Sequence, residues 1–100
     1  MQQAKSGVGR KWFVYMLACA DGTIYTGCTT DVTRRVAEHN TSPRGARYTR
    51  SRRPVSLLAS FECSDRSEAQ REEARVKRLT RRDKMALACD LNPGAGHADD

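Results

Sequence analysis

The sequence predicts a small α+β domain, and three observations predict it. Two β-rich runs flank Asp21-Gly22, a dipeptide that is typical of hairpin turns. A third run, from Pro54 to Glu62, alternates apolar and polar residues as a half-buried strand does. Segments with helical spacing lie between and after these strands, and each begins near a residue that can cap a helix. The elements are taken below in chain order.

The hairpin "KWFVYMLACADGTIYTGC" admits two loops that place its tyrosines differently. A two-residue loop puts Tyr15 and Tyr25 on opposite faces of the sheet, because successive side chains alternate. A three-residue loop, residues 20–22, places Gly22 in a left-handed bulge and puts both tyrosines on one face. We prefer the longer loop, because its third position favours glycine. In that register Tyr15 lies opposite Gly27.

The stretch "DVTRRVAEHN" predicts a helix directly after the hairpin, with Thr30 or Asp31 as its cap. Two valines one turn apart mark its inner face. Arg35 and His39 stand four residues apart, so they share one flank of this helix. The sequence therefore carries a guanidinium and an imidazole close after the hairpin.

Residues 44–53, "RGARYTRSRR", place five arginines around one tyrosine. Glycine and proline mark this segment as a loop. Its arginines can neutralise phosphates, and its tyrosine can stack on an unpaired base. The predicted nucleic-acid-binding residues are Arg44, Arg47, Tyr48, Arg50, Arg52 and Arg53. A flexible basic loop without a defined register is the alternative.

Pro54 can only begin the third strand, because proline cannot donate a hydrogen bond within a sheet. The apolar residues expected on one face of this strand are Val55, Leu57, Ala59 and Phe61. A helix follows, in which Asp65 and Glu68 have the spacing of a capping box. Thr80 and Asp83 repeat that spacing, which predicts a short last helix.

Glu73 borders the apolar stripe of the helix that Asp65 begins. It lies four residues after Ala69 and three before Val76, where an unpaired carboxylate would be costly to bury. We therefore expect a cation beside it, either a metal ion or an arginine. Glu72 fits the helical periodicity at least as well, so the pattern alone leaves the choice between the two glutamates open.

The composition favours a nucleic-acid partner. Eighteen Lys and Arg against twelve Asp and Glu give a net charge of +6, and all the basic residues except Lys5 lie between Arg10 and Lys84. Such a field attracts polyanions. We find neither an apolar run long enough for a membrane span nor a secretion signal, and the four cysteines are scattered, so we expect a cytoplasmic protein.

Five blocks, in order, resemble the GIY-YIG nuclease family, above all its small stand-alone bacterial members. They are "VYML", "YTG", "TTDVTRRVAEHN", "GARYTRSRRP" and "SEAQREEARVKRLTRRDK". The resemblance covers residues 11–88, which we take as the domain, with flexible segments at residues 1–10 and 89–100. It implies a three-stranded antiparallel sheet flanked by about three helices, and a divalent-metal-dependent endonuclease acting on DNA. "FVY" and "YTG" replace the family's two triplets, but both tyrosines and Gly27 are kept.

The resemblance also implies which residues carry the chemistry. The catalytic set would be Tyr15, Tyr25, Arg35, His39 and Glu73. The arrangement "EAQREE" selects Glu73 as the metal ligand, and a single carboxylate suits Mg²⁺ or Mn²⁺. Arg35 can bridge phosphate oxygens, and either Tyr15 or His39 can hold the attacking water. Gly22 and Gly27 are expected to serve structure.

The expected substrate is single-stranded or branched DNA, with RNA not excluded. No second domain is visible that would read a long sequence, so we expect cleavage to select nucleic-acid structure. DNA repair, recombination and processing of incoming DNA all fit such an activity. The alternative is a nucleic-acid-binding domain on the same fold that does not cleave.

Overall fold

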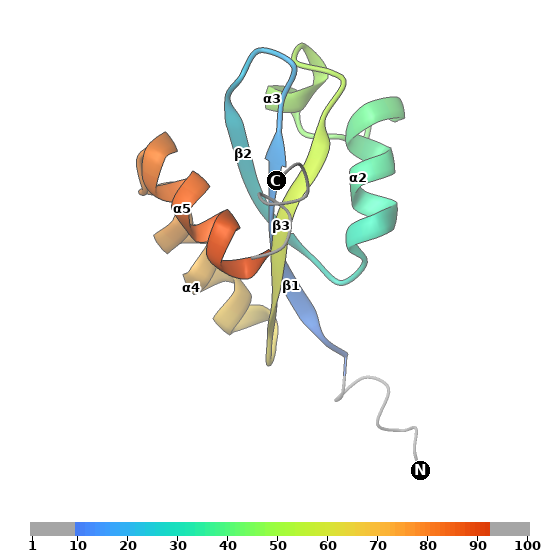
Figure 1. Cartoon of the computed structure of the whole chain (residues 1–100). Coiled ribbons are helices and arrows are strands. Elements are labelled where there is room, and N and C mark those ends of the chain that lie inside the picture. The colour runs from blue at the N-terminus through green and yellow to red at the C-terminus, as the bar shows by residue number, and fades with distance from the viewer. Residues whose placement is uncertain (1–9, 93–100) are drawn as a thin grey trace.

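A computed structural model describes residues 10–92 as a three-stranded sheet with helices on both faces (Figure 1). The strands are β1 (Trp12–Ala18), β2 (Ile24–Thr29) and β3 (Ser56–Cys63). The order is β2-β1-β3 and both pairings are antiparallel, so β1 is the middle strand. The predicted architecture is therefore confirmed. None of the helices in the described residues is long and apolar enough to span a membrane.

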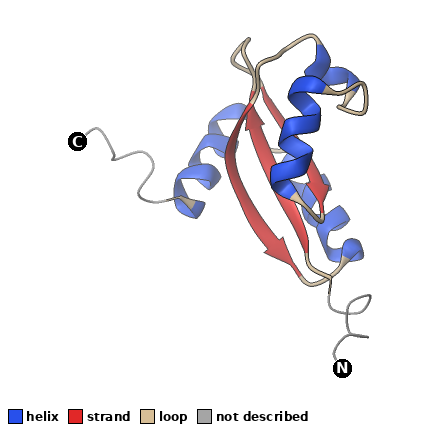
Figure 2. Cartoon of the chain, turned by 90° about the vertical axis from the view of Figure 1, so that its right-hand side faces the viewer, coloured by secondary structure: helices blue, strands red, loops and turns tan. Residues whose placement is uncertain are grey.

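The helices lie on opposite faces of the sheet. α4 (Arg66–Lys77) and α5 (Arg81–Leu91) cover one face, and α2 (Val32–Thr41) covers the other, as Figure 2 shows from the α2 side. The short helix α3 (Arg47–Arg50) follows α2. The last helix is longer than expected and includes residues 89–91, which the sequence pattern assigned to the tail. The other residues of the predicted flexible ends, apart from Arg10 and Asn92, lie outside the described residues.

The hairpin has the longer of the two loops. The Cys19 amide donates to the Thr23 carbonyl at 2.9 Å, and the Gly22 amide donates to the Cys19 carbonyl at 3.0 Å. Gly22 has a φ of +89°, a conformation that residues with a Cβ rarely adopt. Tyr15 consequently pairs with Gly27. The prediction that both tyrosines share one face of the sheet is confirmed.

Two small cores form because alternate residues of β1 point to opposite faces. Val14 and Met16 pack beneath α4 and α5, together with Ala69 and Val76 of α4. The core on the α2 side contains Tyr15, Leu17, Cys19 and Val55, with Val32 and Val36 packed against it. The candidate site adjoins the core on the α2 side, because Tyr15 belongs to that core and to the site.

The helix caps agree with the sequence patterns. Asp31, not Thr30, begins α2, and its carboxylate accepts from the Arg34 amide at 3.1 Å. Asp65 and Thr80 cap α4 and α5 in the same manner. These short-range signals were sufficient because a cap is completed within one turn.

Two expectations were wrong. The register of β3 shifts between Met16 and Leu17, so Val55 and Leu57 do not share the face of Ala59 and Phe61. Val55 belongs to the core on the α2 side, and the Leu57 side chain is exposed. A bulge of this kind inserts one residue, which reverses the alternation beyond it. The segment predicted as a loop also contains the helix α3, which is too short to show helical periodicity.

A candidate active site beside strand β2

Tyr15 and Tyr25 form the floor of the candidate site. Their ring centroids are 6.3 Å apart. A Cβ atom added to Gly27 would lie 2.6 Å from the Tyr15 hydroxyl oxygen, so only glycine leaves space for this ring. Gly27 was expected to have a structural role. Because it has no Cβ, it lets the ring of Tyr15 approach β2 closely.

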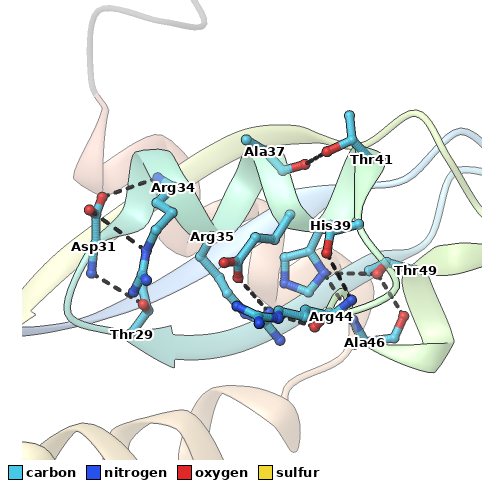
Figure 3. A network of polar contacts seen from close by, with 12 residues as sticks. Thr29, Asp31, Arg34, Arg35, Ala37, His39, Thr41, Arg44, Ala46 and Thr49 are labelled. Carbon is cyan, nitrogen blue, oxygen red and sulfur yellow. Dashed lines mark hydrogen bonds and ion pairs between the residues drawn. The ribbon is translucent and has the colours of Figure 1, made fainter.

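His39 projects from α2 into the same space. It has no exposed surface, and its Nε2 atom lies 2.8 Å from the Tyr15 hydroxyl. Its Nδ1 atom lies 2.8 Å from Thr49 Oγ1, at α3 (Figure 3). The His39 ring centroid is 5.0 Å from that of Tyr25. Burial, with a smaller effect of Arg35, lowers the pKa of His39 from 6.5 to about 4, so the imidazole is neutral at pH 7.

Arg35 lies one turn before His39, on the same flank of α2. Its Nη1 atom donates to Glu38 Oε1 at 2.9 Å. The same atom donates to the Arg44 carbonyl at 2.8 Å (Figure 3). About a quarter of its side chain is exposed. Burial raises the pKa of Tyr15 well above 10, and the neighbouring Arg35 offsets only part of that rise. Tyr15 is therefore a neutral phenol unless its surroundings change.

Glu73 reaches β2 from the opposite face of the sheet. Its Oε1 atom accepts from the Cys28 thiol at 3.1 Å, and its Oε2 atom pairs with Lys77 Nζ at 2.9 Å. Glu72, the alternative that the sequence left open, instead pairs with Arg75 on the helix surface at 2.7 Å. Of the two glutamates, Glu73 is thus the one that faces the sheet.

The two halves of the site meet at Tyr25. Burial raises the pKa of Tyr25, while Lys77 and Arg35 lower it and Glu73 raises it further. Charges from α2 and from α4 therefore both act on one hydroxyl, although the helices lie on opposite faces of the sheet. Of the five residues in the predicted catalytic set, Tyr15, Tyr25, Arg35 and His39 lie on the α2 side of the sheet, and Glu73 lies on the α4 side.

The chemistry of Glu73 fits a hydrated divalent cation. No group of three or more metal-binding side chains is preassembled within residues 10–92, so a cation held by Glu73 would take its other ligands from water and from substrate. Mg²⁺ and Mn²⁺ prefer oxygen ligands, and Mg²⁺ keeps several waters and commonly binds through one carboxylate and substrate phosphates. About a fifth of the Glu73 side chain is exposed, which leaves access for such an ion.

The predicted basic segment divides into exposed and anchored residues. Arg44, Arg47 and Arg50 are exposed. Arg53 is half-buried and donates to the His39 carbonyl at 2.6 Å and to the Ser42 carbonyl at 2.7 Å. These contacts hold the end of α2, so Arg53 has a structural task whatever else it contacts.

The Arg52 guanidinium packs on the ring of Tyr48. The guanidinium carbon of Arg52 lies 3.9 Å above the centroid of the Tyr48 ring, and Arg52 also pairs with Asp21 at 2.8 Å. Tyr25 lies near the Tyr48 ring at 5.9 Å between centroids. Tyr48 is 38% exposed, so a base that stacks on its face would first have to displace Arg52.

Sequence reasoning missed four residues of this site: Glu38, Thr49, Cys28 and Lys77. Glu38 and Lys77 stand three and four residues after Arg35 and Glu73, and this spacing could have indicated both ion pairs. Strand alternation could have placed Cys28 toward α4. Thr49 gave no signal, because it lies in the segment taken as a loop.

Comparison with known proteins agrees with this geometry. The GIY-YIG catalytic domain matches residues 11–86. A UPF0213 protein from Desulfotalea psychrophila is 57% identical over 76 residues, 76% of this chain and 69% of that protein. A UPF0213 protein from Halobacterium salinarum is 55% identical over 74 residues, 74% and 95% of the two chains. The solution NMR structure of a protein from E. faecalis, 39% identical, covers 82% of this chain and 86% of that one with a TM-score of 0.56. The chain therefore belongs to the GIY-YIG family, a family of nucleases.

Proposed function

We propose that this protein is an endonuclease that hydrolyses phosphodiester bonds in DNA and depends on Mg²⁺ or Mn²⁺. The observation that carries the proposal is the arrangement around Tyr25. The Tyr25 ring lies 5.0 Å from that of His39 on α2, between centroids, and Cys28 of the same strand donates its thiol hydrogen to Glu73 of α4 at 3.1 Å. Hydrolysis of a phosphodiester needs positive charge at the phosphate and a group that takes a proton from water, and this site offers both.

Each side chain has a distinct task in the proposed reaction. Arg35 exchanges its contact with Glu38 for the phosphate oxygens, which its fork of donors can bridge. The Tyr25 hydroxyl donates a hydrogen bond to the same phosphate. Glu73 would hold the cation, which when bound supplies positive charge at the phosphate oxygens. Further negative charge develops on the phosphate oxygens during the reaction, so these interactions become stronger in the transition state than in the ground state.

The water's proton passes to Tyr15, not directly to His39. His39 is fully buried, and its Nε2 atom faces the Tyr15 hydroxyl. Tyr15 is itself 1% exposed, and Arg35 lies beside its hydroxyl. When a phosphate draws Arg35 outward, the hydroxyl becomes accessible to water. Neutral His39 then accepts the proton that Tyr15 releases.

Structure-selective cleavage follows from the kind of contacts offered. The exposed arginines Arg44, Arg47 and Arg50 contact phosphates, which carry no sequence information. The exposed part of Tyr48 can contact an unpaired base. We therefore propose single-stranded or branched DNA as the preferred substrate.

The test uses labelled single-stranded, duplex and branched DNA of one sequence, incubated with Mg²⁺ or Mn²⁺ and then with a chelator. Cleavage should require the cation and be abolished in Arg35→Ala and Glu73→Gln. Glu72→Gln is the matched control, since it neutralises the adjacent carboxylate on the same helix, and it should retain activity. If Glu73→Gln and Glu72→Gln cut equally well, the assignment of Glu73 is wrong.

A non-catalytic nucleic-acid-binding domain is the second candidate, and the three exposed arginines favour it as much as the first. It predicts salt-sensitive binding of the same DNAs without any strand scission. Binding that persists where no substrate is cut, with either cation, would select this function and reject the endonuclease.

A further inference from the structure

Three hydrogen bonds run in series from α3 to the middle of the sheet. Thr49 Oγ1 donates to the Ala46 carbonyl at 2.9 Å, Thr49 Oγ1 lies 2.8 Å from His39 Nδ1, and His39 Nε2 lies 2.8 Å from the Tyr15 hydroxyl. The exposed fractions of Thr49, His39 and Tyr15 are 0%, 0% and 1%. Because these groups are withdrawn from water, each proton needs an acceptor inside the protein.

The Tyr15 proton sets the direction of the series, because Nε2 is its one acceptor within hydrogen-bond distance among the described residues. The Thr49 hydroxyl can direct its proton to the Ala46 carbonyl, which also accepts from the Thr49 and Arg50 amides at 3.1 Å. The lone pairs of Oγ1 then face His39, and Nδ1 carries the imidazole hydrogen. Nε2 is left as an acceptor for the Tyr15 proton. In the opposite tautomer, Nε2 would donate to Tyr15, and the phenol proton would have no recorded acceptor among the described residues.

One further contact bears on Nδ1. The Ala46 amide lies 3.5 Å from this atom, which would favour an unprotonated Nδ1. That separation is at the limit of a hydrogen bond, whereas the contact with Thr49 has a short and favourable length. The contact with Thr49 is compatible with either atom donating, so the tautomer is decided at Nε2, which must accept the Tyr15 proton.

We propose that Thr49 is a positioning residue that holds His39 as its Nδ1–H tautomer, so that Nε2 accepts the hydroxyl proton of Tyr15. The tautomer follows from hydrogen bonding alone, whereas its effect on cleavage rests on the proposed function. As a water oxygen bonds to phosphorus and the bond to the leaving oxygen breaks, the water's proton goes to Tyr15. The proton that Tyr15 held goes to Nε2, and the leaving oxygen takes a proton from solvent.

The imidazolium formed in this step keeps its Nδ1–H hydrogen bond to Thr49. The Thr49 hydroxyl neither rotates nor changes its partner. Without the Thr49 oxygen, Nδ1–H would be a buried donor without a partner, and the other tautomer would be favoured. Nε2 would then carry a hydrogen and could not take one from Tyr15. Thr49 would thus affect the rate of proton transfer although it touches no substrate.

The first experiment reads the tautomer directly. The full chain, labelled with ¹⁵N-histidine, is studied by long-range ¹H–¹⁵N NMR near pH 7, without DNA or metal. His39 should show Nδ1 protonated and Nε2 unprotonated. Thr49→Val, which has nearly the same shape but no hydroxyl, should shift His39 toward Nε2–H, and Thr49→Ser should keep the parent pattern. An Nε2–H signal in the parent protein would overturn the proposal, even if Thr49→Val does not fold.

The second experiment measures cleavage by the same variants. Thr49→Val should lower kcat by about tenfold to a hundredfold with KM little changed, because general acid–base assistance is lost. Thr49→Ser should restore kcat, which a purely steric role of the threonine would not predict. If Thr49→Val keeps both the Nδ1–H tautomer and the parent kcat, the role of Thr49 is rejected. If the parent cuts no DNA, the endonuclease function fails, while the NMR result still decides the role of Thr49.

Discussion

Gly27 and Tyr15 act as one unit at the residue scale. The hydroxyl of Tyr15 occupies the place that a Cβ of residue 27 would need. The ring cannot move aside without giving up its hydrogen bond to His39. The absence of a side chain in β2 is therefore as important to the position of the hydroxyl as the presence of the tyrosine in β1.

Gly27→Ala should lower activity per folded molecule at least tenfold, because it displaces the Tyr15 hydroxyl that general-base transfer needs. Crowding should also lower the free energy of unfolding by about 1–3 kcal/mol. The matched control is Gly22→Ala in the same hairpin. It meets no atom within 4 Å, but its φ of +89° strains any residue with a Cβ, so it should cost about 1–2 kcal/mol of stability and leave activity unchanged. Urea unfolding and cleavage rates, measured on both variants, check this pair; equal activity in the two would contradict it.

Much of the site at this scale could be predicted from the sequence. The positions of Tyr15, Tyr25 and Gly27 depend on one choice of hairpin loop, and glycine at its third position indicated that choice. The partners of the reactive groups could not be predicted, because Thr49 and Cys28 meet His39 and Glu73 only when distant elements pack together. Neither contact leaves a periodic signal.

The segment after α2 illustrates what happens at the scale of an element. Its high arginine content predicted a binding loop, yet its residues have two different tasks. Arg53 binds the last carbonyls of α2 and of the turn that follows it, whereas Arg47 and Arg50 point to solvent from α3. Caps and hairpin turns could be predicted because they are local. The bulge at Leu57 and the four residues of α3 could not, because tertiary contacts decide them.

Variants should separate the two kinds of arginine. Arg47→Ala and Arg50→Ala should each weaken DNA binding and reduce the slope of log affinity against log salt by about one, with the free energy of unfolding unchanged. Arg53→Ala should lower the free energy of unfolding by about 1–3 kcal/mol, because it leaves half-buried carbonyls without donors. Binding titrations at several salt concentrations, with thermal unfolding alongside, measure both effects. An unchanged salt slope in the two α3 variants would show that these arginines do not contact phosphates.

At the scale of the whole molecule, the buried network couples the stability of the domain to pH. Tyr15, His39 and Thr49 join β1, α2 and α3 through hydrogen bonds. Burial and the nearby charges of Arg35 and Arg53 disfavour protonation of His39, and Glu38 only partly opposes them. Protonation of this ring at equilibrium is therefore unfavourable, and the ring belongs to a network that joins three elements.

Acidification from pH 6.5 to 4 should destabilise the fold. The unfolded chain protonates His39 near pH 6.5, whereas the folded state does so only near pH 4, so the unfolded state binds more protons within this window. The loss should reach about 3 kcal/mol at the acid end and be absent above pH 7. Urea unfolding at a series of pH values tests this, with His39→Gln as the control. A parent and a variant with equal slopes between pH 5 and 6.5 would show that His39 is not responsible.

The order of the sheet has a consequence for association between chains. β2 has a neighbouring strand on one side only, and an exposed strand of this kind can pair with a strand of another molecule. Here the charged pair Glu73–Lys77 stands against β2, and a second strand would have to bury it or push it aside. The carboxylate proposed to hold the cation, together with its ion-pair partner, thus also discourages aggregation through β2. Variants that neutralise both should be checked for self-association before any loss of activity in them is interpreted as loss of chemistry.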